Sequence, residues 1–366
     1  MKQGKSSPYS NFDYDSALSV QEGVHKPEQV SNFYLEKVRA RNRKQPTVAE
    51  MVDGILRHDR AMLSRAITLV ESSLAEHHEL AKQVIDACLP YSGQSVRLGI
   101  TGVPGAGKST VIEALGTMLT GYGHKVAVLA IDPSSERSRG SILGDKTRME
   151  ELSADPNAFI RPSPSAGSLG GVARKTREII LLCEAAGFDT VIVETVGVGQ
   201  SEVAAHSMVD FFLLIQLANT GDELQGIKRG IMEMADMVAI NKCDIDPNKS
   251  ALAAQQFRNA LHLFPMPESE WPVEVMMCSA YTKEGIASIW HKVQEYVAFA
   301  KRTGYFYHKR QHQNLRILSE VVEGALKDRF YGSMASQLVA VQKQVEQGQL
   351  NAYSAADALI EQYFGE

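Results

Sequence analysis

RLGITGVPGAGKSTVIEAL, residues Arg97 to Leu115, is the stretch that decides the fold. It reads as a buried strand, a glycine-rich turn and the start of a helix, and its centre, GVPGAGKS, fits the pattern GxxxxGK[ST]. The glycines let backbone N–H groups turn inward onto a β-phosphate, and the positive end of the following helix strengthens the attraction. The sequence therefore predicts a P-loop that cradles the phosphates of a nucleotide.

The side chains around this turn have distinct expected roles. Lys108 is expected to reach the β- and γ-phosphate oxygens, where its charge would also serve catalysis. The hydroxyl of Ser109 is expected to bind magnesium, and Thr110 is expected near the α-phosphate. The predicted phosphate-binding residues are Gly102, Val103, Pro104, Gly105, Ala106, Gly107, Lys108, Ser109 and Thr110.

A second motif, NKCD at residues 241–244, ends a later apolar run and selects the base. The Asp244 carboxylate can accept hydrogen bonds from N1–H and the 2-amino group of guanine, and adenine has neither donor in that place. Asn241 is expected to approach guanine N7, and the stem of Lys242 is expected to cover the base. GTP and GDP are therefore the expected nucleotides.

The sequence CSA, residues 278–280, follows one strand later and completes the expected base pocket. The backbone N–H of Ala280 is predicted to reach guanine O6, with Ser279 and Tyr281 on either side. The P-loop, NKCD and CSA occur in this order, so chance is a poor explanation for the set.

Acidic residues between these motifs are expected to sense the γ-phosphate. Glu194 ends the buried run VIVET, at the Walker B position, and Gly197 follows three residues later with an N–H for the γ-phosphate. Asp132 and Asp145 lie in a Gly/Ser-rich segment that suits a switch loop. Spacing does not rank Asp132 against Asp145 for binding magnesium or orienting the attacking water. The expected magnesium and catalytic carboxylates are thus Glu194, Asp132 and Asp145, beside Ser109 as a metal ligand.

Charge and cysteine content exclude several classes of protein. The 38 Lys and Arg nearly balance the 43 Asp and Glu, and a net charge of -5 offers no basic surface for nucleic acid or an anionic membrane. The four cysteines form no CxxC pair, and no apolar run is long enough to span a bilayer, so a cytoplasmic protein is expected. His77 and His78 have no third ligand in view, and a solvated helix face is expected there.

Apolar runs that alternate with helical stretches predict a doubly wound α/β domain with a mostly parallel sheet over residues 95–300. A polar tail is expected over 1–46, a helical segment over 47–94 and further amphipathic helices over 301–366. The predicted strands are VRLGIT, KVAVLAID, DTVIVET, DFFLLIQL, MVAINKCD and VEVMMCSA.

With these motifs in view, the chain resembles the MeaB/ArgK family, the GTPase chaperones of methylmalonyl-CoA mutase, which includes the human methylmalonic aciduria type A protein. The resemblance runs from about Met51 to the C-terminus and rests on GVPGAGKST, AIDPSS, GSILGDKTRM, FIRPSPSAGSLGG, VIVETVGVGQSE, TGDELQGIKRGIMEMAD and NKCD. It implies a P-loop NTPase of the signal-recognition and metal-insertion GTPase class, and a homodimer built partly by the C-terminal helices.

The resemblance also implies a cellular function and further residue roles. GTP binding and hydrolysis would gate the delivery of adenosylcobalamin from a cobalamin adenosyltransferase to the mutase, and would protect the mutase. Glu194 would be a magnesium and catalytic carboxylate, and Asp132 and Asp145 would be switch I residues. Asp222, Gln225 and Lys228 would form a further switch that relays the mutase signal, although the residues alone indicate only an N-capped helix there.

Three other functions remain open on the sequence. A kinase of an arginine/ornithine (LAO/AO) transport system would need to accept ATP, which NKCD opposes. A metal-insertion GTPase would be expected to carry a His-rich tail or a CxxC pair, and the chain has neither. A dimerisation module without hydrolysis would be expected to have lost site residues, yet Lys108, Ser109 and Glu194 are present.

Overall fold

The computed structural model describes residues 46–131, 149–162, 169–195, 200–218 and 229–365. Contacts divide the chain into two units, Met1–Thr47 and Val48–Glu366, and every element described below belongs to the second. None of the described helices is both long and apolar enough to cross a lipid bilayer.

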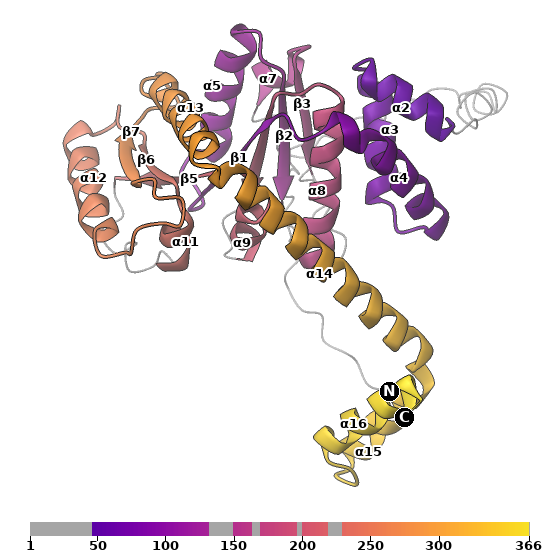
Figure 1. Cartoon of the computed structure of the whole chain (residues 1–366). Coiled ribbons are helices and arrows are strands. Elements are labelled where there is room, and N and C mark those ends of the chain that lie inside the picture. The colour runs from indigo at the N-terminus through magenta and orange to yellow at the C-terminus, as the bar shows by residue number, and fades with distance from the viewer. Residues whose placement is uncertain (1–45, 132–148, 163–168, 196–199, 219–228, 366) are drawn as a thin grey trace, which may run out of the picture. The chain divides into compact units, whose positions relative to one another are not determined.

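A seven-stranded sheet forms the centre of the structure, and every strand pairing in it is parallel (Figure 1). The strand order is β3-β2-β4-β1-β5-β6-β7. The predicted doubly wound sheet is therefore confirmed. The strands are β1 Val96–Gly102, β2 Val126–Ile131, β3 Ala158–Pro162, β4 Thr190–Thr195, β5 Phe211–Leu217, β6 Met237–Asn241 and β7 Glu274–Met277.

Strand β3 is the strand that sequence reasoning missed. It is an edge strand of five residues, AFIRP, and pairs only with β2 among the described strands. Its apolar run stops after Ile160, because Arg161 and Pro162 complete the strand. Pro162 lacks an N–H donor, which an edge position tolerates and a central strand does not. A short run of this kind carries too little periodicity to be recognised.

Helices cover both faces of the sheet. Alternate residues of β2 enter different cores: Val126 and Val128 pack on the face covered by α5 and α13, whereas Ala127 and Leu129 pack on the face covered by α8 and α9. This alternation of two apolar faces is what a parallel sheet between helical layers requires. The helices that the structure describes in this domain are α5 Lys108–Gly121, α7 Glu150–Ala154, α8 Leu169–Ala185, α9 Gln200–His206, α11 Arg229–Met234, α12 Pro247–Leu261 and α13 Ile286–Thr303.

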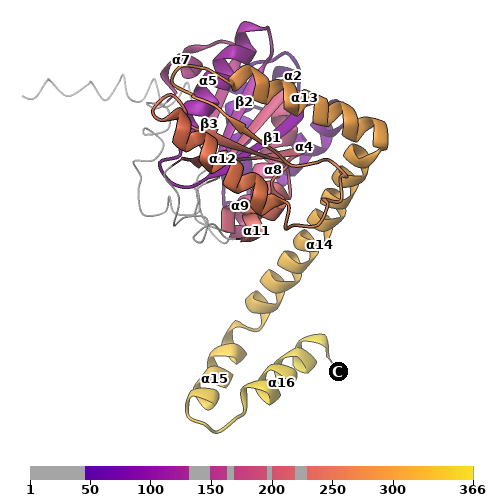
Figure 2. The same ribbon diagram turned by 90° about the vertical axis from the view of Figure 1, so that its left-hand side faces the viewer.

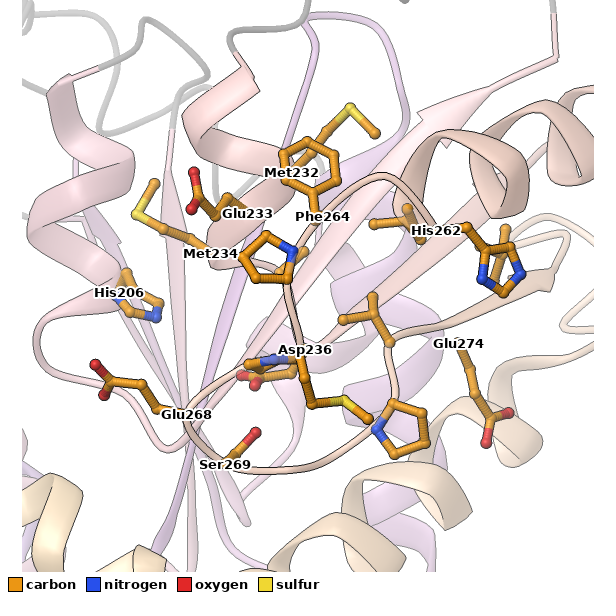
Figure 3. Close-up of a pocket in the computed structure, with 18 of the residues that line it drawn as sticks. His206, Met232, Glu233, Met234, Asp236, His262, Phe264, Glu268, Ser269 and Glu274 are labelled. Atoms are coloured by element: carbon orange, nitrogen blue, oxygen red, sulfur yellow. The ribbon is translucent and has the colours of Figure 1, made fainter.

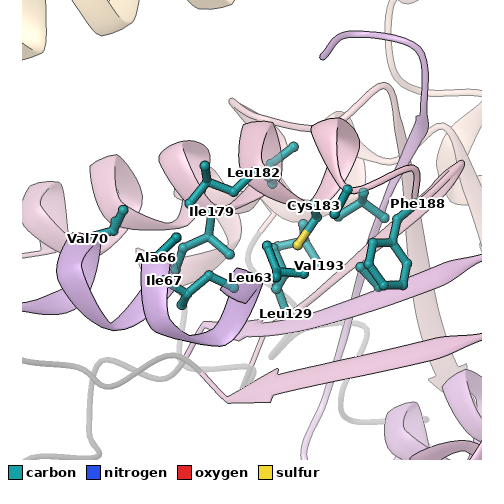
Figure 4. Close-up of a cluster of buried hydrophobic side chains, with 14 of the residues drawn as sticks. Leu63, Ala66, Ile67, Val70, Leu129, Ile179, Leu182, Cys183, Phe188 and Val193 are labelled. Carbon is teal, nitrogen blue, oxygen red and sulfur yellow. The ribbon is translucent and has the colours of Figure 1, made fainter. Parts of the chain in front are cut away.

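In the described part of the chain, three α-helices precede the sheet and pack against α8. They are α2 Val48–Leu56, α3 Arg60–Glu71 and α4 Ala75–Cys88, and the short helix η1 Leu89–Tyr91 leads into β1. Figure 4 shows Leu63 and Ile67 of α3 facing Ile179 and Leu182 of α8. Buried apolar side chains thus join this N-terminal segment to the sheet domain, with an ion pair between Glu71 and Arg161 beside them.

The adjacent histidines have a structural role. His77 Nδ1 lies 2.8 Å from Ser72 Oγ, and His78 Nε2 lies 2.8 Å from the carbonyl oxygen of Ser72. Both rings therefore brace the turn between α3 and α4. Among the described residues, no group of three or more potential ligands gathers to hold a metal ion.

Three further helices follow α13: α14 Tyr305–Ser333, α15 Ala335–Glu346 and α16 Ala352–Phe364. Figure 2 shows α14 continuing from α13 and leading to α15 and α16. Phe330 of α14 packs edge-to-face on Tyr363 of α16, with ring centroids 5.1 Å apart. Along the middle of α14, in contrast, Leu315, Leu318, Val322 and Leu326 are exposed.

The packing of α3 on α8 predicts a large stability loss for Leu63→Ala. Leu63 is fully buried, so truncation leaves a cavity and is expected to lower the free energy of unfolding by about 2–5 kcal/mol. Urea denaturation followed by circular dichroism measures this loss. Leu74→Ala is the control, because Leu74 is 59 % exposed and its truncation is expected to change stability by about 0.5 kcal/mol or less. Equal losses in the two variants would contradict the packing of α3 on α8.

Candidate nucleotide site

The P-loop connects β1 to α5 and depends on two glycines that no larger residue can replace. Gly102 ends β1 with φ 152°, and a Cβ there would lie 2.1 Å from the carbonyl oxygen of Ile215 on β5. Gly107 has φ 87°, and a Cβ there would lie 2.7 Å from Asn241 Nδ2. Side chains rarely adopt these backbone angles and cannot occupy this space. The loop therefore approaches its neighbours as closely as a phosphate cradle requires.

Lys108 begins α5 and folds back over the loop. Its Nζ donates to the carbonyl oxygens of Gly102 at 2.9 Å and Val103 at 3.3 Å, and the residue is only 8 % exposed. An ammonium group at this place carries its charge within the loop, beside the backbone amides that begin α5. The predicted role of Lys108 at the β- and γ-phosphates is compatible with this position.

The structure brings together two of the predicted magnesium ligands. Ser109 Oγ donates to Glu194 Oε1 at 3.1 Å, and Glu194 lies near the end of β4, which pairs with β1. Behind them, the buried hydroxyls of Thr195 and Thr101 form a hydrogen bond of 2.8 Å between the same two strands. A hydroxyl and a carboxylate are oxygen donors of the kind that Mg²⁺ prefers, so this pair fits the predicted ion.

Asn241 ties three parts of the site together. Its Nδ2 donates to the carbonyl oxygen of Ala106 in the P-loop at 2.8 Å. Its Oδ1 accepts from the N–H of Ala280 at 3.0 Å and lies 3.7 Å from the Sγ of Cys278, which donates to it. The residue is buried at the carboxyl end of β6. One amide side chain therefore sets the distance between the phosphate loop and the expected base loop.

This arrangement adds a function that sequence reasoning missed. The sequence assigns Asn241 to guanine N7 and the Ala280 N–H to guanine O6, whereas the structure commits these two groups to each other. The contacts of both residues with guanine stay predictions. The order of NKCD and CSA in the sequence does not by itself reveal the hydrogen bond between Asn241 and Ala280. That inference also requires knowing that β6 and β7 are neighbours in the sheet.

The remaining base-pocket residues lie around the same turn. Lys242 has φ 62° and is exposed, whereas Cys243 next to it is buried. Asp244 and Tyr281 are both exposed, as a rim that meets a ligand requires, and Ser279 is buried beneath them. Burial raises the pKa of the Cys278 thiol to about 12, so this sulfur stays protonated.

Several predicted site residues lie outside the described part of the chain. They are Asp132, Asp145, Gly197, Asp222, Gln225 and Lys228. Their roles stay predictions.

Comparison with known proteins identifies the family. The model of the family described as "Methylmalonyl Co-A mutase-associated GTPase MeaB" matches residues 63–335. The GTPase ArgK of Escherichia coli is 47% identical over 288 residues, covering 78% of this chain and 87% of that protein. The mouse (Mus musculus) protein named methylmalonic aciduria type A homolog, mitochondrial, is 42% identical over 335 residues, covering 88% of this chain and 81% of that protein.

A solved structure shares the fold. The crystal structure of a protein named LAO/AO transport system kinase has a TM-score of 0.70 and 38% sequence identity, covering 87% of this chain and 98% of that chain. The chain therefore belongs to the MeaB family and is a P-loop GTPase that binds GTP and GDP and hydrolyses GTP.

The bridging contacts of Asn241 predict that Asn241→Asp weakens nucleotide binding. The substitution keeps the size of the side chain but removes the Nδ2 donor and places a carboxylate oxygen against the carbonyl of Ala106. Losing a buried hydrogen bond of this kind is expected to reduce GDP affinity by about 10- to 100-fold, measured by titration with a fluorescent GDP analogue.

Asn259→Asp is the control for this experiment. It is the same chemical substitution at an exposed position of α12. Its GDP affinity is expected to equal that of the unaltered protein. If Asn241→Asp also binds GDP as tightly as the control, Asn241 does not organise the site.

Proposed function

We propose that this MeaB-family GTPase is a chaperone of the adenosylcobalamin-dependent methylmalonyl-CoA mutase. In this proposal GTP binding and hydrolysis gate the delivery of adenosylcobalamin from a cobalamin adenosyltransferase to the mutase, and protect the mutase. The observation that carries the proposal is the family match over residues 63–335, in a chain whose Ser109, Glu194 and Asn241 converge on one edge of the sheet. The name of the family links it to this mutase.

The site residues supply the parts that hydrolysis of GTP needs. Ser109 and Glu194 would hold magnesium, which when bound neutralises charge on the β- and γ-phosphates. Lys108 would add a second positive charge at the same oxygens. Asp132 or Asp145 would orient the attacking water, and the N–H of Gly197 would sense the γ-phosphate. The output of the reaction is a change in conformation, because the released phosphate removes the contacts that hold the switches.

The C-terminal helices support the proposal of a homodimer. Leu315, Leu318, Val322 and Leu326 recur at helical spacing on α14 and are exposed. A second copy of the chain would bury this apolar face. We place the protein in the cytoplasm and assign Asp222, Gln225 and Lys228 to the switch that the mutase contacts.

One observation favours a second function. The solved structure with a TM-score of 0.70 is that of a protein named LAO/AO transport system kinase, and a kinase would transfer the γ-phosphate to a protein instead of water. The base pocket separates the two functions, because the proposed contact of Asp244 with guanine selects GTP over ATP.

The assignment of Asp244 predicts altered base selection in Asp244→Asn. The asparagine amide can donate to the 2-oxo group of xanthine but repels the 2-amino group of guanine. GTP affinity is therefore expected to fall about 10- to 100-fold and xanthosine triphosphate affinity to rise, with the fold unchanged because Asp244 is exposed. Competition binding with GTP, xanthosine triphosphate and ATP measures this change. An unaltered preference for GTP over ATP and xanthosine triphosphate would refute the assignment of Asp244 to the guanine base.

The chaperone proposal predicts that the mutase stimulates GTP hydrolysis. Phosphate release by the purified protein is expected to be slow with GTP, to rise at least about tenfold when methylmalonyl-CoA mutase is added, and to be negligible with ATP. The rise follows from a partner that completes the switch conformation.

Isobutyryl-CoA mutase is the matched control client in this assay. Stimulation by that enzyme alone would keep the chaperone function and change the client. A rate that neither mutase changes would overturn the chaperone proposal, and comparable turnover of ATP would favour the kinase.

A further inference from the structure

The amino edge of the sheet, opposite the nucleotide site, holds a buried ionic contact that the GTPase chemistry does not use. Arg310 of α14 donates from Nε to Asp210 Oδ1 at 2.8 Å and from Nη2 to Asp210 Oδ2 at 2.7 Å. The same guanidinium donates to the carbonyl oxygens of Gly93 at 2.6 Å and Ser95 at 2.7 Å. The side chain of Asp210 is 1 % exposed and that of Arg310 is 12 % exposed. A fork with four hydrogen bonds holds α14 in one orientation.

Three further side chains join α14, directly or through α8, to residues 207–210, the segment that contains Asp210. Lys309 Nζ donates to the carbonyl oxygen of Asp210 at 2.8 Å, and Gln313 Nε2 donates to that of Val209 at 2.9 Å. Arg177 of α8 contacts Glu320 of α14 at 2.5 Å and Ser207 Oγ at 2.7 Å. We call these contacts, together with the Arg310–Asp210 pair, the α14 joint. They concentrate on residues 207–210.

Residues 207–210 connect α9 to β5, and α9 leads back to the nucleotide site. The helix begins at Gln200, and β4 ends at Thr195, directly after the Glu194 that contacts Ser109 of α5. Only four residues and a helix of seven therefore separate the end of β4 from the α14 joint. A displacement at the start of α9 reaches the joint through two turns of helix.

A cavity of about 930 Å³ lies beside the joint (Figure 3). His206 at the end of α9, Met234 at the end of α11, Asp236 just before β6, and Lys309 of α14 contribute to its wall. Burial and the positive charges of Lys309 and Arg316 lower the pKa of His206 to about 3, so its ring is neutral and packs edge-to-face on Phe212. The end of α9 therefore borders this cavity through His206, while the opposite side of the helix packs into the core through Ala205.

From this geometry we propose that Arg310 and Asp210 are a positioning pair for GTP hydrolysis, which couples α9 to α14. The γ-phosphate moves the start of α9, the α14 joint passes this movement to α14, and α14 carries its exposed apolar face with it. In the other direction, a partner that holds α14 steadies α9 and so favours hydrolysis. The inference rests on the proposed function for what docks on α14, but the coupling itself requires only a GTPase.

Hydrogen–deuterium exchange of the full-length protein tests this coupling without any mutase. Backbone amides of residues 314–326 are expected to exchange at different rates with GDP and with guanylyl imidodiphosphate bound. In Arg310→Gln this nucleotide-dependent difference is expected to vanish, while both nucleotides bind within about twofold of the original affinity. The kcat for GTP is expected to fall about 3- to 10-fold with KM unchanged, because α9 loses its support.

Three further variants make the result decisive. Glu71→Gln removes the charge of the partly buried ion pair with Arg161, which joins α3 to β3. This variant is expected to keep both the nucleotide-dependent exchange difference and the kcat of the unaltered protein. Arg310→Lys keeps a cation beside Asp210 but cannot make the fork, so partial rescue is expected. Gln313→Leu removes one neutral hydrogen bond, together with a buried oxygen that has no partner among the described residues. This variant tests the α14 joint if Arg310→Gln fails to fold. It is expected to reduce the nucleotide-dependent difference.

Two outcomes would overturn the proposal. One is an equal exchange rate over residues 314–326 with both nucleotides in the unaltered protein. The other is a nucleotide-dependent difference that persists in Arg310→Gln or, if that variant does not fold, in Gln313→Leu. Because no mutase is present, these outcomes are independent of whether the mutase stimulates hydrolysis.

Discussion

The parallel direction of all the strands in the sheet is the constraint on which the rest of the structure depends. Every strand ends at the same edge, so β1, β4 and β6 deliver the P-loop, Glu194 and Asn241 to one place although they are far apart in the sequence. Every strand also begins at the opposite edge, where Ser95, Asp210 and Asp236 immediately precede β1, β5 and β6. We call the edge that carries the nucleotide site the chemical edge and the edge that carries the α14 joint the mechanical edge. The helices run from one edge to the other.

Local patterns alone predict which residues form the chemical edge. The P-loop is contiguous, and NKCD and CSA each follow a strand, so their side chains could be assigned without knowing the strand order. The link between Asn241 and both loops could not, because it depends on β6 and β7 being neighbours and on the P-loop lying within hydrogen-bond reach of Asn241. Strand β3 was not predicted for another reason, since Arg161 and Pro162 interrupt the apolar pattern by which strands are recognised.

The mechanical edge was invisible to sequence reasoning. Arg310 and Asp210 are 100 positions apart, and neither stands in a motif. A charged residue on an amphipathic helix is usually solvated, so Lys309, Arg310 and Arg316 look like the outer face of α14. Only the fold shows that Arg310 and Lys309 enter the protein and that the apolar residues Leu315 and Leu318 face outward. In α14, therefore, charged residues are largely buried and apolar residues are exposed, which partly reverses the usual pattern of a surface helix. The buried charges attach the helix to its own domain and leave the apolar face for a partner.

The burial of all four cysteines has a practical consequence. Cys88, Cys183, Cys243 and Cys278 are free thiols inside the folded protein, and burial raises the pKa of each. Electrophiles attack the thiolate, which is scarce in such surroundings. An alkylating reagent will therefore modify a sulfur mainly when the surrounding segment opens. Cys88 marks the N-terminal helices, Cys183 the central α8, and Cys243 and Cys278 the base pocket, so the unmodified chain carries its own site-resolved reporters of local unfolding.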